Sequence, residues 1–352
     1  MARPTPPVAR LALPVPATLE QLFDPDWFSR ALAHLGRGPV AECQVVETRE
    51  AMAAKVRLLV HFADDGSLPL CAKGFFAAGM AGAAAVTRRE GRFYADVAPH
   101  LELHLPACYA VVSDPGGERC VLLLADLAAA GAHFPTALEP LTPEQVAETL
   151  GQLAHLHATT ELLANNPWLG ERLPEILASP YPGWSRTQAL MHDARRGDLP
   201  ADTLDAERLR RALERLAAWA AATPHSVLHG DGHPGNLFRF GDGRLGFLDW
   251  QLVHRGPWAL DVAYHLNAAL PVEVAEREER ALLDHYLAAL ARHGGRAPSF
   301  ATAWEDYRRA LPYGFYHWCI TQRVRPEAIT HETFRRLGWA VTRHQSYRLL
   351  GA

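Results

Sequence analysis

The first third of the chain alternates apolar and polar residues over short segments, a pattern typical of β-strands that bury one face. Such strands are expected over residues 43–47, 54–62, 68–75, 107–113 and 120–124. Helical spacing predicts helices over residues 19–35 and 83–97. Asp64-Asp65-Gly66 has the residue types of a hairpin turn and lies between the second and third strands. The proline-rich residues 1–18 are expected to form a flexible tail.

Helical periodicity dominates the remainder of the chain. Thr142-Pro143-Glu144-Gln145 is a capping box with proline at the first helical position, so it predicts the start of a helix. Further helices are expected over residues 259–268, 272–291 and 304–320, and a polar stretch between them is expected to form short strands over 226–228, 236–240 and 245–248. The pattern predicts an α+β protein with a small strand-rich N-lobe over residues 19–126 and a larger helical C-lobe over residues 127–352.

The net charge, the apolar runs and the cysteine pattern indicate which partners and which cellular compartment to expect. The 352 residues include 35 Lys and Arg against 39 Asp and Glu, a net charge of −4, without a long basic run. A nucleic-acid partner is therefore not expected. No apolar run is long enough to cross a bilayer, so membrane insertion is not expected. The five cysteines are scattered and never spaced as C-x-x-C, which favours reduced thiols in a cytoplasmic protein.

The polar stretch contains the residues that suggest chemistry. It begins with His229-Gly230-Asp231-Gly232-His233-Pro234-Gly235-Asn236 and ends with Gly246-Phe247-Leu248-Asp249-Trp250. Asp231 is expected on a loop, where a carboxylate can orient an acceptor hydroxyl and accept its proton. Asn236 and Asp249 offer the oxygen ligands that Mg²⁺ prefers. The interval of five positions from Asp231 to Asn236, followed by a later Asp, matches the spacing of protein kinases.

The same stretch also allows a different interpretation. His229, Asp231 and His233 follow the pattern His-x-Asp-x-His and could offer three ligands to a transition metal. No fourth ligand at helical or hairpin spacing accompanies them, so the magnesium interpretation is preferred.

The signature His-Gly-Asp-x-His-x-x-Asn, followed by an Asp after a hydrophobic strand, resembles that of the aminoglycoside phosphotransferase and choline-kinase-like family. The resemblance covers the chain from about Cys43 to the C-terminus. It implies a protein-kinase-like two-lobed fold with ATP and Mg²⁺ as cofactors. It implies that Asp231 is the catalytic base or orienter and that Asn236 and Asp249 hold magnesium. His229 and a buried acid, Asp261, would support the backbone of the catalytic loop.

Three further segments are similar to the ecdysteroid-kinase-like branch of this family. They are Asp249-Trp250-Gln251, Asp261-Val262-Ala263-Tyr264 and Tyr307-Arg308-Arg309-Ala310-Leu311.

Three residues of the strand-rich part are candidates for cofactor binding. In kinases a strand lysine reaches the α- and β-phosphates and is held by a glutamate of the next helix. Lys73 ends a predicted strand, and Glu90 lies in the predicted helix that follows. Asp126 follows the last strand at the expected hinge, where backbone groups would pair with adenine. The alternatives are a solvated strand-end lysine for Lys73 and a surface Glu–Arg pair for Glu90.

One departure from the kinase pattern leaves a second hypothesis open. Kinases cover the phosphates with a glycine-containing loop, because backbone N–H groups must approach closely, but residues 48–54 contain no glycine. The leading hypothesis is a kinase that moves the γ-phosphoryl group of Mg·ATP directly, in line, to a hydroxyl of a small molecule. The alternative is a pseudokinase-like nucleotide or ligand sensor without efficient transfer.

The sequence does not name the acceptor. Residues 165–223 and the final helices are the candidate walls of its site, and an aromatic cluster over residues 313–318 is their most distinctive feature. The helical part has no concentrated acidic patch, which counts against a polycationic aminoglycoside. The arginine-rich C-terminal segment leaves open an acceptor that carries a phosphate or carboxylate.

Overall fold

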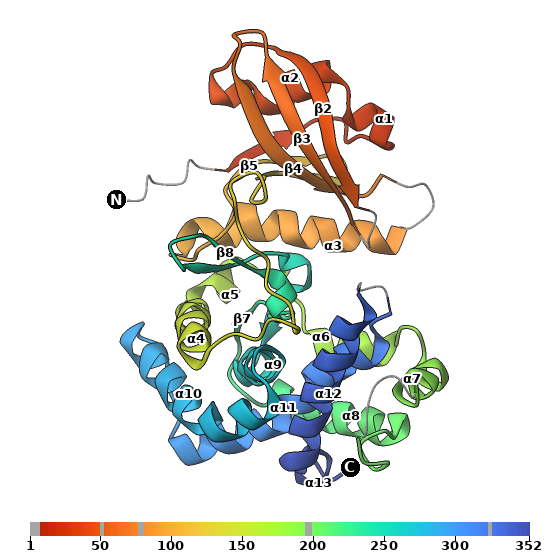
Figure 1. Ribbon diagram of the computed structural model, residues 1–352, viewed down its shortest axis with the longest axis vertical. Helices are drawn as coiled ribbons and strands as arrows, with labels where there is room; N and C mark the ends of the chain where they lie inside the picture. Colours follow the sequence, from red (N-terminus) through yellow and green to blue (C-terminus); the bar gives the residue numbers. More distant parts are fainter. Residues whose placement is uncertain (1–7, 50–52, 77–80, 194–198, 323–325) are drawn as a thin grey trace. The chain divides into compact units, whose positions relative to one another are not determined.

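The structure, a computed structural model, describes residues 8–49, 53–76, 81–193, 199–322 and 326–352 (Figure 1). The glycine-free loop over residues 48–54 falls partly outside them, at residues 50–52. Internal contacts divide the chain into two units. The strand-rich unit comprises the chain up to His133 together with Leu248–Leu252, and the helical unit comprises Phe134–Phe247 and Val253–Ala352.

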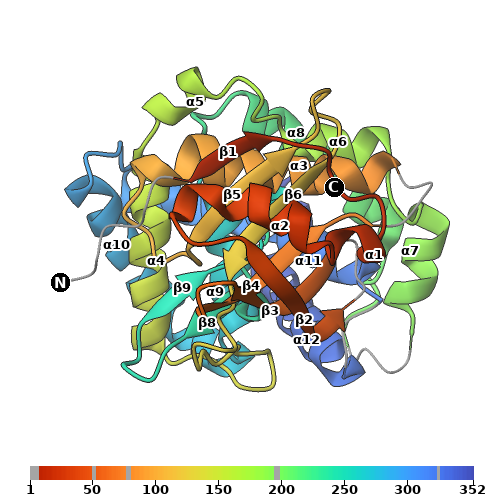
Figure 2. The same cartoon turned by 90° about the horizontal axis from the view of Figure 1, so that it is seen from above.

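A six-stranded sheet forms the frame of the strand-rich unit, in the order β1-β5-β6-β4-β3-β2 (Figure 2). All neighbours pair antiparallel except β1, which runs parallel to β5. The strands are β1 (Ala9–Ala12), β2 (Val40–Arg49), β3 (Ala54–Phe62), β4 (Ser67–Gly74), β5 (Cys108–Ser113) and β6 (Cys120–Ala125). The helical segments are α1 (Leu19–Leu22), α2 (Pro25–Leu32), η1 (Ala33–Leu35), α3 (Ala81–Arg92), the π-helical η2 (Phe93–Val97) and η3 (Ala98–His100).

The two faces of this sheet pack against different helices, because successive strand side chains point to opposite faces. On one face, α2 contributes Phe28 to a buried core that includes Val112 of β5. On the other face, α3 lies against β5 and β6, where Gly91 approaches Val111 and Cys120 closely. Val111 and Val112 are neighbours on β5, so one faces α3 and the other faces the core that includes α2.

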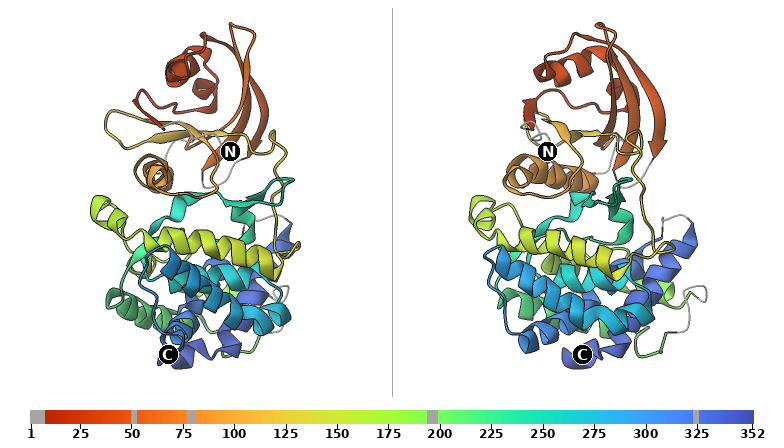
Figure 3. Two further views of the ribbon diagram at one scale, coloured as in Figure 1. Left: turned by 90° about the vertical axis from the view of Figure 1, so that its left-hand side faces the viewer. Right: turned by 60° about the vertical axis from the view of Figure 1, so that its left-hand side comes forward.

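The helical unit is built around one fully buried helix, α9 (Ala259–Ala269), which contacts α4, α10, α11 and α12 (Figure 3). Two short antiparallel pairs, β7 with β10 and β8 with β9, join these helices. The helices are α4 (Pro143–Ala158), α5 (Glu161–Asn165), α6 (Arg172–Ala178), α7 (Trp184–Met191), α8 (Ala206–Ala221), α10 (Val272–Arg292), α11 (Phe300–Ile320), α12 (Glu327–Arg343) and α13 (Ser346–Leu349). The short elements are β7 (Ser226–Leu228), η5 (Pro234–Asn236), β8 (Leu237–Arg239), β9 (Leu245–Phe247), η6 (Trp250–Leu252) and β10 (His254–Gly256).

Most predicted elements form within a few residues of their expected bounds, but two predictions about the N-terminus were wrong. The helix expected over residues 19–35 is interrupted, because Asp24 caps a new helix that has Pro25 in its first turn. The expected flexible tail over residues 1–18 contains β1, whose Leu11 packs against the buried core. Residues 1–7 of that tail lie outside the described residues.

All five cysteines are free thiols. Within the described ranges, no helix combines the length and the apolar character that a membrane crossing requires. The cytoplasmic location expected from the cysteine pattern stays a prediction.

Gly91→Ala is expected to destabilise the protein, because an added Cβ would lie 2.7 Å from Cys120 Sγ and 3.1 Å from Val111 Cγ1. Overpacking of this kind costs about 1–3 kcal/mol, which exceeds the gain of at most about 1 kcal/mol in helix propensity. Gly151→Ala in α4 is the matched control, since nothing lies within 4 Å of its added Cβ, and it should be neutral or stabilising. Urea unfolding would give both free energies, and a Gly91→Ala protein as stable as wild type would contradict the close packing of α3.

Candidate active site

Four charged side chains of the strand-rich unit form a lysine–carboxylate cluster: Lys55, Lys73, Glu90 and Asp249. Lys73 Nζ lies 2.6 Å from Asp249 Oδ1 and 2.5 Å from Glu90 Oε2. Lys55 Nζ lies 2.8 Å from Asp249 Oδ2. Each oxygen of the Asp249 carboxylate therefore faces one ammonium group. The structure thus brings together Lys73, Glu90 and Asp249, which were selected from separate parts of the sequence.

The segment that carries Asp249 is fixed to α3 by its own backbone. Asp249 adopts the left-handed conformation, with a φ of 65°. The next residue, Trp250, donates its backbone N–H to Glu90 Oε1 at 3.3 Å and stacks its ring on Phe93 with centroids 3.8 Å apart. Because Glu90 also binds Lys73 through its other oxygen, one glutamate orients both the lysine and the segment that carries its carboxylate partner.

Burial makes the pairing of these charges necessary. The side chains of Lys73, Glu90 and Asp249 are 3%, 1% and 9% exposed, and an unpaired charge at such a place costs several kcal/mol. Burial alone would raise the pKa of Asp249, but the charges of Lys55 and Lys73 hold it well below its usual range. Burial likewise opposes the charge on Lys73, yet Asp249 and Glu90 raise the pKa of Lys73 above its usual value. Asp249 and Lys73 are therefore both charged at neutral pH.

Asp126, the hinge candidate, is engaged within the protein. Arg57 Nε donates to its two carboxylate oxygens at 3.1 and 3.0 Å, and the backbone N–H groups of Ala128 and Ala129 donate to Oδ1. With a side chain that is 3% exposed, this carboxylate stabilises the turn after β6. A contact between this position and adenine stays a prediction, and it would come from the backbone.

In the helical unit, the Asp231 carboxylate is held from two sides. Tyr264 donates its hydroxyl to Asp231 Oδ1 at 2.9 Å, and Asn236 Nδ2 donates to Asp231 Oδ2 at 3.0 Å. Trp318 Nε1 in turn donates to the Tyr264 hydroxyl at 2.7 Å. A relay from α11 through α9 therefore orients a carboxylate whose side chain remains 16% exposed.

Asp261 of α9 holds the backbone of the loop that carries Asp231. Its carboxylate oxygens accept the backbone N–H groups of His229 at 2.6 Å and Gly230 at 2.8 Å, and His157 Nε2 lies 3.2 Å from Oδ2. Gly230 has a φ of 83°, in the left-handed region that favours glycine. Burial would raise the pKa of Asp261, but the hydrogen bond and charge of His157 bring it below its usual value. The structure thus joins Asp261 to His229, the two residues proposed to support the loop.

The histidines of this loop bind its own backbone. His229 Nδ1 accepts the N–H of Asp231 at 3.1 Å, and His233 Nδ1 accepts the N–H of Gly235 at 3.1 Å. In the part of the chain that the structure describes, no three His, Cys, Asp or Glu side chains gather as metal ligands. A transition-metal site built from His229, Asp231 and His233 is therefore disfavoured, because two of the ring nitrogens already accept hydrogen bonds.

Two buried histidines near this loop are neutral at physiological pH. Burial lowers the pKa of His265 to about 4 and that of His317 to about 3. His265 Nδ1 lies 2.5 Å from the carbonyl oxygen of Gly232, and its Nε2 lies 2.7 Å from Thr149 Oγ1. A carbonyl oxygen only accepts, so the neutral ring must donate from Nδ1. His265 is thus a third residue of α9, after Asp261 and Tyr264, that fixes the loop.

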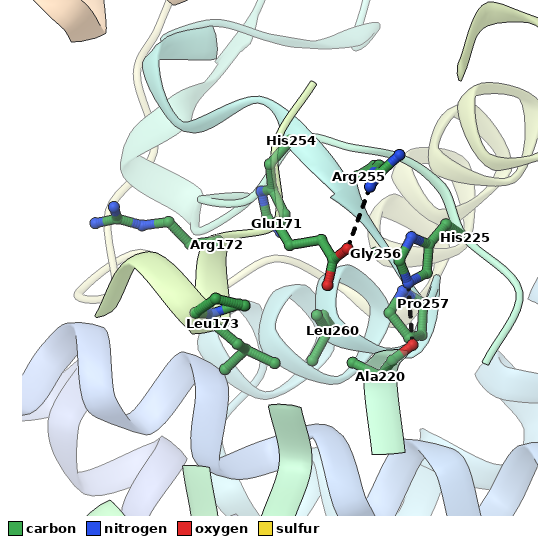
Figure 4. Close-up of a pocket in the computed structure, with 11 residues that line it drawn as sticks. Glu171, Arg172, Leu173, Ala220, His225, His254, Arg255, Gly256, Pro257 and Leu260 are labelled. Carbon is green, nitrogen blue, oxygen red and sulfur yellow. Dashed lines mark hydrogen bonds and ion pairs between the residues drawn. The ribbon is translucent and has the colours of Figure 1, made fainter. Parts of the chain in front are cut away.

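Figure 4 shows a hollow of the helical unit beside α6, α8 and β10. Its volume is about 10 Å³, room for roughly one water molecule. Glu171 and Arg255 form an ion pair of 3.3 Å at its edge, and His225 Nε2 lies 3.0 Å from the carbonyl oxygen of Ala220. The described residues that line it include none of the predicted site residues, and the hollow is too small for an acceptor.

A match to the model of one protein family shows which proteins the chain is related to. The model of the phosphotransferase enzyme family matches residues 57–298, more than half of the chain. The chain belongs to this family. The predicted relationship to aminoglycoside phosphotransferases and choline kinases is thereby confirmed, whereas the narrower similarity to the ecdysteroid-kinase-like branch stays a prediction.

The chain is also similar to a curated relative in sequence and to solved structures in fold. Homoserine kinase of Bradyrhizobium sp. (strain ORS 278) is 29% identical over 192 residues, which cover 52% of this chain and 56% of the relative. The chain thus spans about half the length of this curated relative. A proposed aminoglycoside phosphotransferase of Ralstonia eutropha JMP134 has a TM-score of 0.55 at 12% identity and covers 94% of this chain and 98% of its own. Choline kinase LicA of Streptococcus pneumoniae has a TM-score of 0.51 at 12% identity, over 90% of this chain and 98% of its own. These structures confirm the predicted protein-kinase-like α+β fold.

Sequence reasoning missed Lys55, although the predicted hairpin turn contained the signal. The backbone N–H of Phe62 binds the carbonyl of Gly66 across that turn, and counting back along both strands places Lys55 directly opposite Lys73. Directly opposite residues of an antiparallel pair project from the same face. A turn at Asp64-Asp65-Gly66 therefore predicts that the two lysines are neighbours.

Two partners in the helical unit were missed as well. Tyr264 lies three residues after Asp261 on α9, so helical spacing places both on one face. That spacing was a usable signal for Tyr264 beside the loop. Trp318 belongs to the aromatic cluster over residues 313–318, which was considered only as a wall of the acceptor site, and no local pattern connected it to Tyr264.

The oxygen donors of Asn236 and Asp249 are of the kind that a magnesium ion binds. Both hydrogen bonds of the Asn236 side chain, to Asp231 O at 2.9 Å and to Asp231 Oδ2 at 3.0 Å, use Nδ2. Asn236 Oδ1 is then available as an oxygen ligand, and Asp249 offers carboxylate oxygens. Hard oxygen donors of this kind suit Mg²⁺.

Tyr264→Phe is expected to lower the free energy of unfolding by about 1–3 kcal/mol, because it removes a buried hydroxyl that serves both Trp318 and Asp231. Tyr181→Phe is the matched control, since Tyr181 is 66% exposed and surface changes usually stay within about 0.5 kcal/mol. Urea unfolding of the two variants measures the difference. Equal stability of Tyr264→Phe and wild type would contradict the relay.

The buried neutral histidines predict an acid-sensitive fold. As pH falls below the unfolded pKa of about 6.5, the unfolded chain takes up protons that folded His265, with a pKa of about 4, does not. The contribution of His265 to the free energy of unfolding is therefore fully present above about pH 6.5. It falls by about 1.4 kcal/mol per pH unit between pH 6.5 and 4. His265→Asn should reduce this slope, and the same exchange at exposed His34 should not. Urea unfolding across this pH range measures the slope, and an unchanged slope in His265→Asn would contradict the prediction.

Proposed function

We propose that the protein is a kinase that transfers the γ-phosphoryl group of ATP to a hydroxyl group of a small molecule. The oriented Asp231 carboxylate, with hydrogen bonds from Tyr264 and Asn236, supports this proposal most directly. An acceptor hydroxyl at Asp231 would be aligned by the carboxylate and would give up its proton to it as its oxygen bonds to the γ-phosphorus. The bond from the γ-phosphorus to the β,γ-bridging oxygen would break, and ADP would leave. Transfer would be direct and in line, without a covalent enzyme intermediate.

The lysine–carboxylate cluster supports the nucleotide side of the proposal. Lys73, held by Glu90, would position the α- and β-phosphates. Asn236 and Asp249 would hold Mg²⁺, which when bound neutralises oxygens of the β- and γ-phosphates. Positioning and electrostatic stabilisation supply most of the catalysis in phosphoryl transfer. Side chains fixed by several partners, such as Asp231 and Lys73, meet that requirement.

The relatives suggest acceptors to test first. Homoserine and choline are the first two, because proteins similar to this chain are named for their phosphorylation. A polycationic aminoglycoside is less favoured because the helical part of the sequence lacks a concentrated acidic patch. A cytoplasmic location is part of the same proposal.

A pseudokinase-like sensor is the second candidate function. The absence of glycine from residues 48–54 motivates it, since backbone N–H groups cover the phosphates in other kinases. A sensor would bind nucleotide or another ligand and transfer phosphate poorly. The presence of Asp231, Asn236 and Asp249 favours the kinase.

Asp231→Asn is expected to keep nucleotide binding but to lose about 10²–10⁴ in turnover, because the amide cannot accept the hydroxyl proton. Binding is measured as a rise in melting temperature with Mg·ATP, since a ligand at a hundred times its Kd stabilises by about 2.7 kcal/mol. Turnover is measured by mass spectrometry of phosphorylated products from homoserine, choline and a broad set of alcohols.

Asp242→Asn is the matched control for this experiment, because Asp242 is an exposed turn residue that pairs with Arg244. It should retain full turnover. Equal turnover by Asp231→Asn and wild type would remove the proposed role of Asp231. A melting shift without any phosphorylated product would favour the sensor.

A further inference from the structure

The chain contains only two lysines, and both contact the same carboxylate. Of its 35 Lys and Arg residues, Lys55 and Lys73 alone are lysines. Their ammonium groups lie 2.8 Å from Asp249 Oδ2 and 2.6 Å from Asp249 Oδ1 respectively. Arginine is used everywhere else, even on the same strand, where Arg57 pairs with Asp126. Lysine is thus reserved for the two positions at which a compact ammonium group meets Asp249.

The two lysines differ in how firmly they are held. Lys73 is 3% exposed and is shared between Asp249 and Glu90. The side chain of Lys55 is 36% exposed, and among the described residues its ion pair is with Asp249 alone. The ammonium of Lys55 can therefore return to water when it leaves Asp249, provided that another cation takes its place at the buried carboxylate. Lys73 is held by two buried carboxylates and has no such freedom.

The register of the sheet gives Lys55 a second place to bind. Lys55 and Lys73 are directly opposite in the antiparallel pair of β3 and β4. Side chains at such positions project from the same face, with Cβ atoms roughly 4.5–5.5 Å apart. A phosphate bound by Lys73 would therefore lie within reach of the flexible four-carbon side chain of Lys55.

We propose that Lys55 is a second phosphate-binding residue, which pairs with Asp249 in the metal-free protein and moves to a phosphate oxygen when Mg·nucleotide binds. The inference rests on the proposed function. In this exchange Lys55 gives up Asp249 Oδ2 to the ion and gains a phosphate oxygen, so each charged group keeps a partner of opposite charge. Residues 48–54 contain no glycine, and the ammonium of Lys55 supplies a donor to the phosphates that a glycine-rich loop supplies through its backbone.

Amine labelling measures the accessibility of the Lys55 ammonium group without measuring catalysis. The result is easy to assign, because the chain has only two lysines besides its N-terminal amine. Brief reductive methylation of the full chain, quantified by peptide mass spectrometry, would compare the free protein with samples containing the Mg²⁺ complex of the β,γ-imido analogue of ATP or adenosine. We expect modification of Lys55 in the free protein, severalfold protection by the Mg²⁺–analogue complex and none by adenosine, with Lys73 unmodified throughout. Equal modification with and without saturating analogue, or protection by adenosine, would overturn the proposal.

Substitutions separate a phosphate contact from a structural role. Lys55→Met should weaken binding of Mg·ATP by about 10- to 100-fold, the effect of losing a charge-assisted hydrogen bond. It should leave adenosine binding unchanged, which also shows that the variant is folded, and Lys55→Arg should recover part of the loss. Arg37→Met removes one positive charge at an exposed position of the same unit and should change the affinity by less than about twofold.

The outcomes distinguish this inference from the function on which it rests. If wild type shows no melting shift with Mg·ATP, the proposed function itself fails, and the role of Lys55 fails with it. If wild type shows a shift and Lys55→Met binds Mg·ATP with equal affinity, only the role of Lys55 is overturned.

Discussion

A buried charge must be paired, and the pairing of Asp249 ties the strand-rich unit together. Its two oxygens take ammonium groups from β3 and β4, and Glu90 of α3 holds both Lys73 and the backbone of Trp250. Leaving one of these charges unpaired would cost several kcal/mol, a large share of the net stability of an ordinary domain. Two strands, a helix and a segment from much later in the chain are therefore held in one arrangement by four charged groups.

The carboxylates of the helical unit are held mainly by hydrogen bonds from neutral groups. Asp231 accepts from a tyrosine hydroxyl and a side-chain amide, and Asp261 accepts from two backbone N–H groups. The hydroxyl of Tyr264 and the amide of Asn236 orient the Asp231 carboxylate without bringing a counter-charge to it, which suits a group proposed to accept a proton. Asp249 is paired with cations instead, which suits a group proposed to exchange one cation for another. The two environments match the two proposed roles.

The sequence could predict whatever depends on local pattern. Strand β3 has the predicted bounds because alternation and a strong turn signal are both local, and the capping box at Thr142 forms as its residue types indicate. The loop motif and the family resemblance selected Asp231, Asn236 and Asp249, and the structure surrounds these residues with polar and charged partners. Their roles stay proposals.

Other features depend on packing that no local pattern encodes. The hydrogen bond between Glu90 and Trp250 joins residues 160 positions apart, and Trp318 reaches Tyr264 from a different helix. Both contacts follow from how helices pack, which hydrophobic periodicity does not specify. Strand β1 was missed for another reason, because a proline-rich composition averaged over the N-terminus concealed one short apolar segment that completes the sheet edge.

The use of two lysines at Asp249, in a chain otherwise built with arginine, has a geometric reason. A guanidinium group binds a carboxylate in a planar fork and takes both oxygens from one side. Each ammonium of the cluster takes a single oxygen, so Lys55 and Lys73 divide the carboxylate between them. One oxygen can then be released to an ion while the other remains fixed by a buried lysine. An arginine at position 55 would keep the positive charge, but its planar fork favours both oxygens of one partner, so it would replace the lysine only in part.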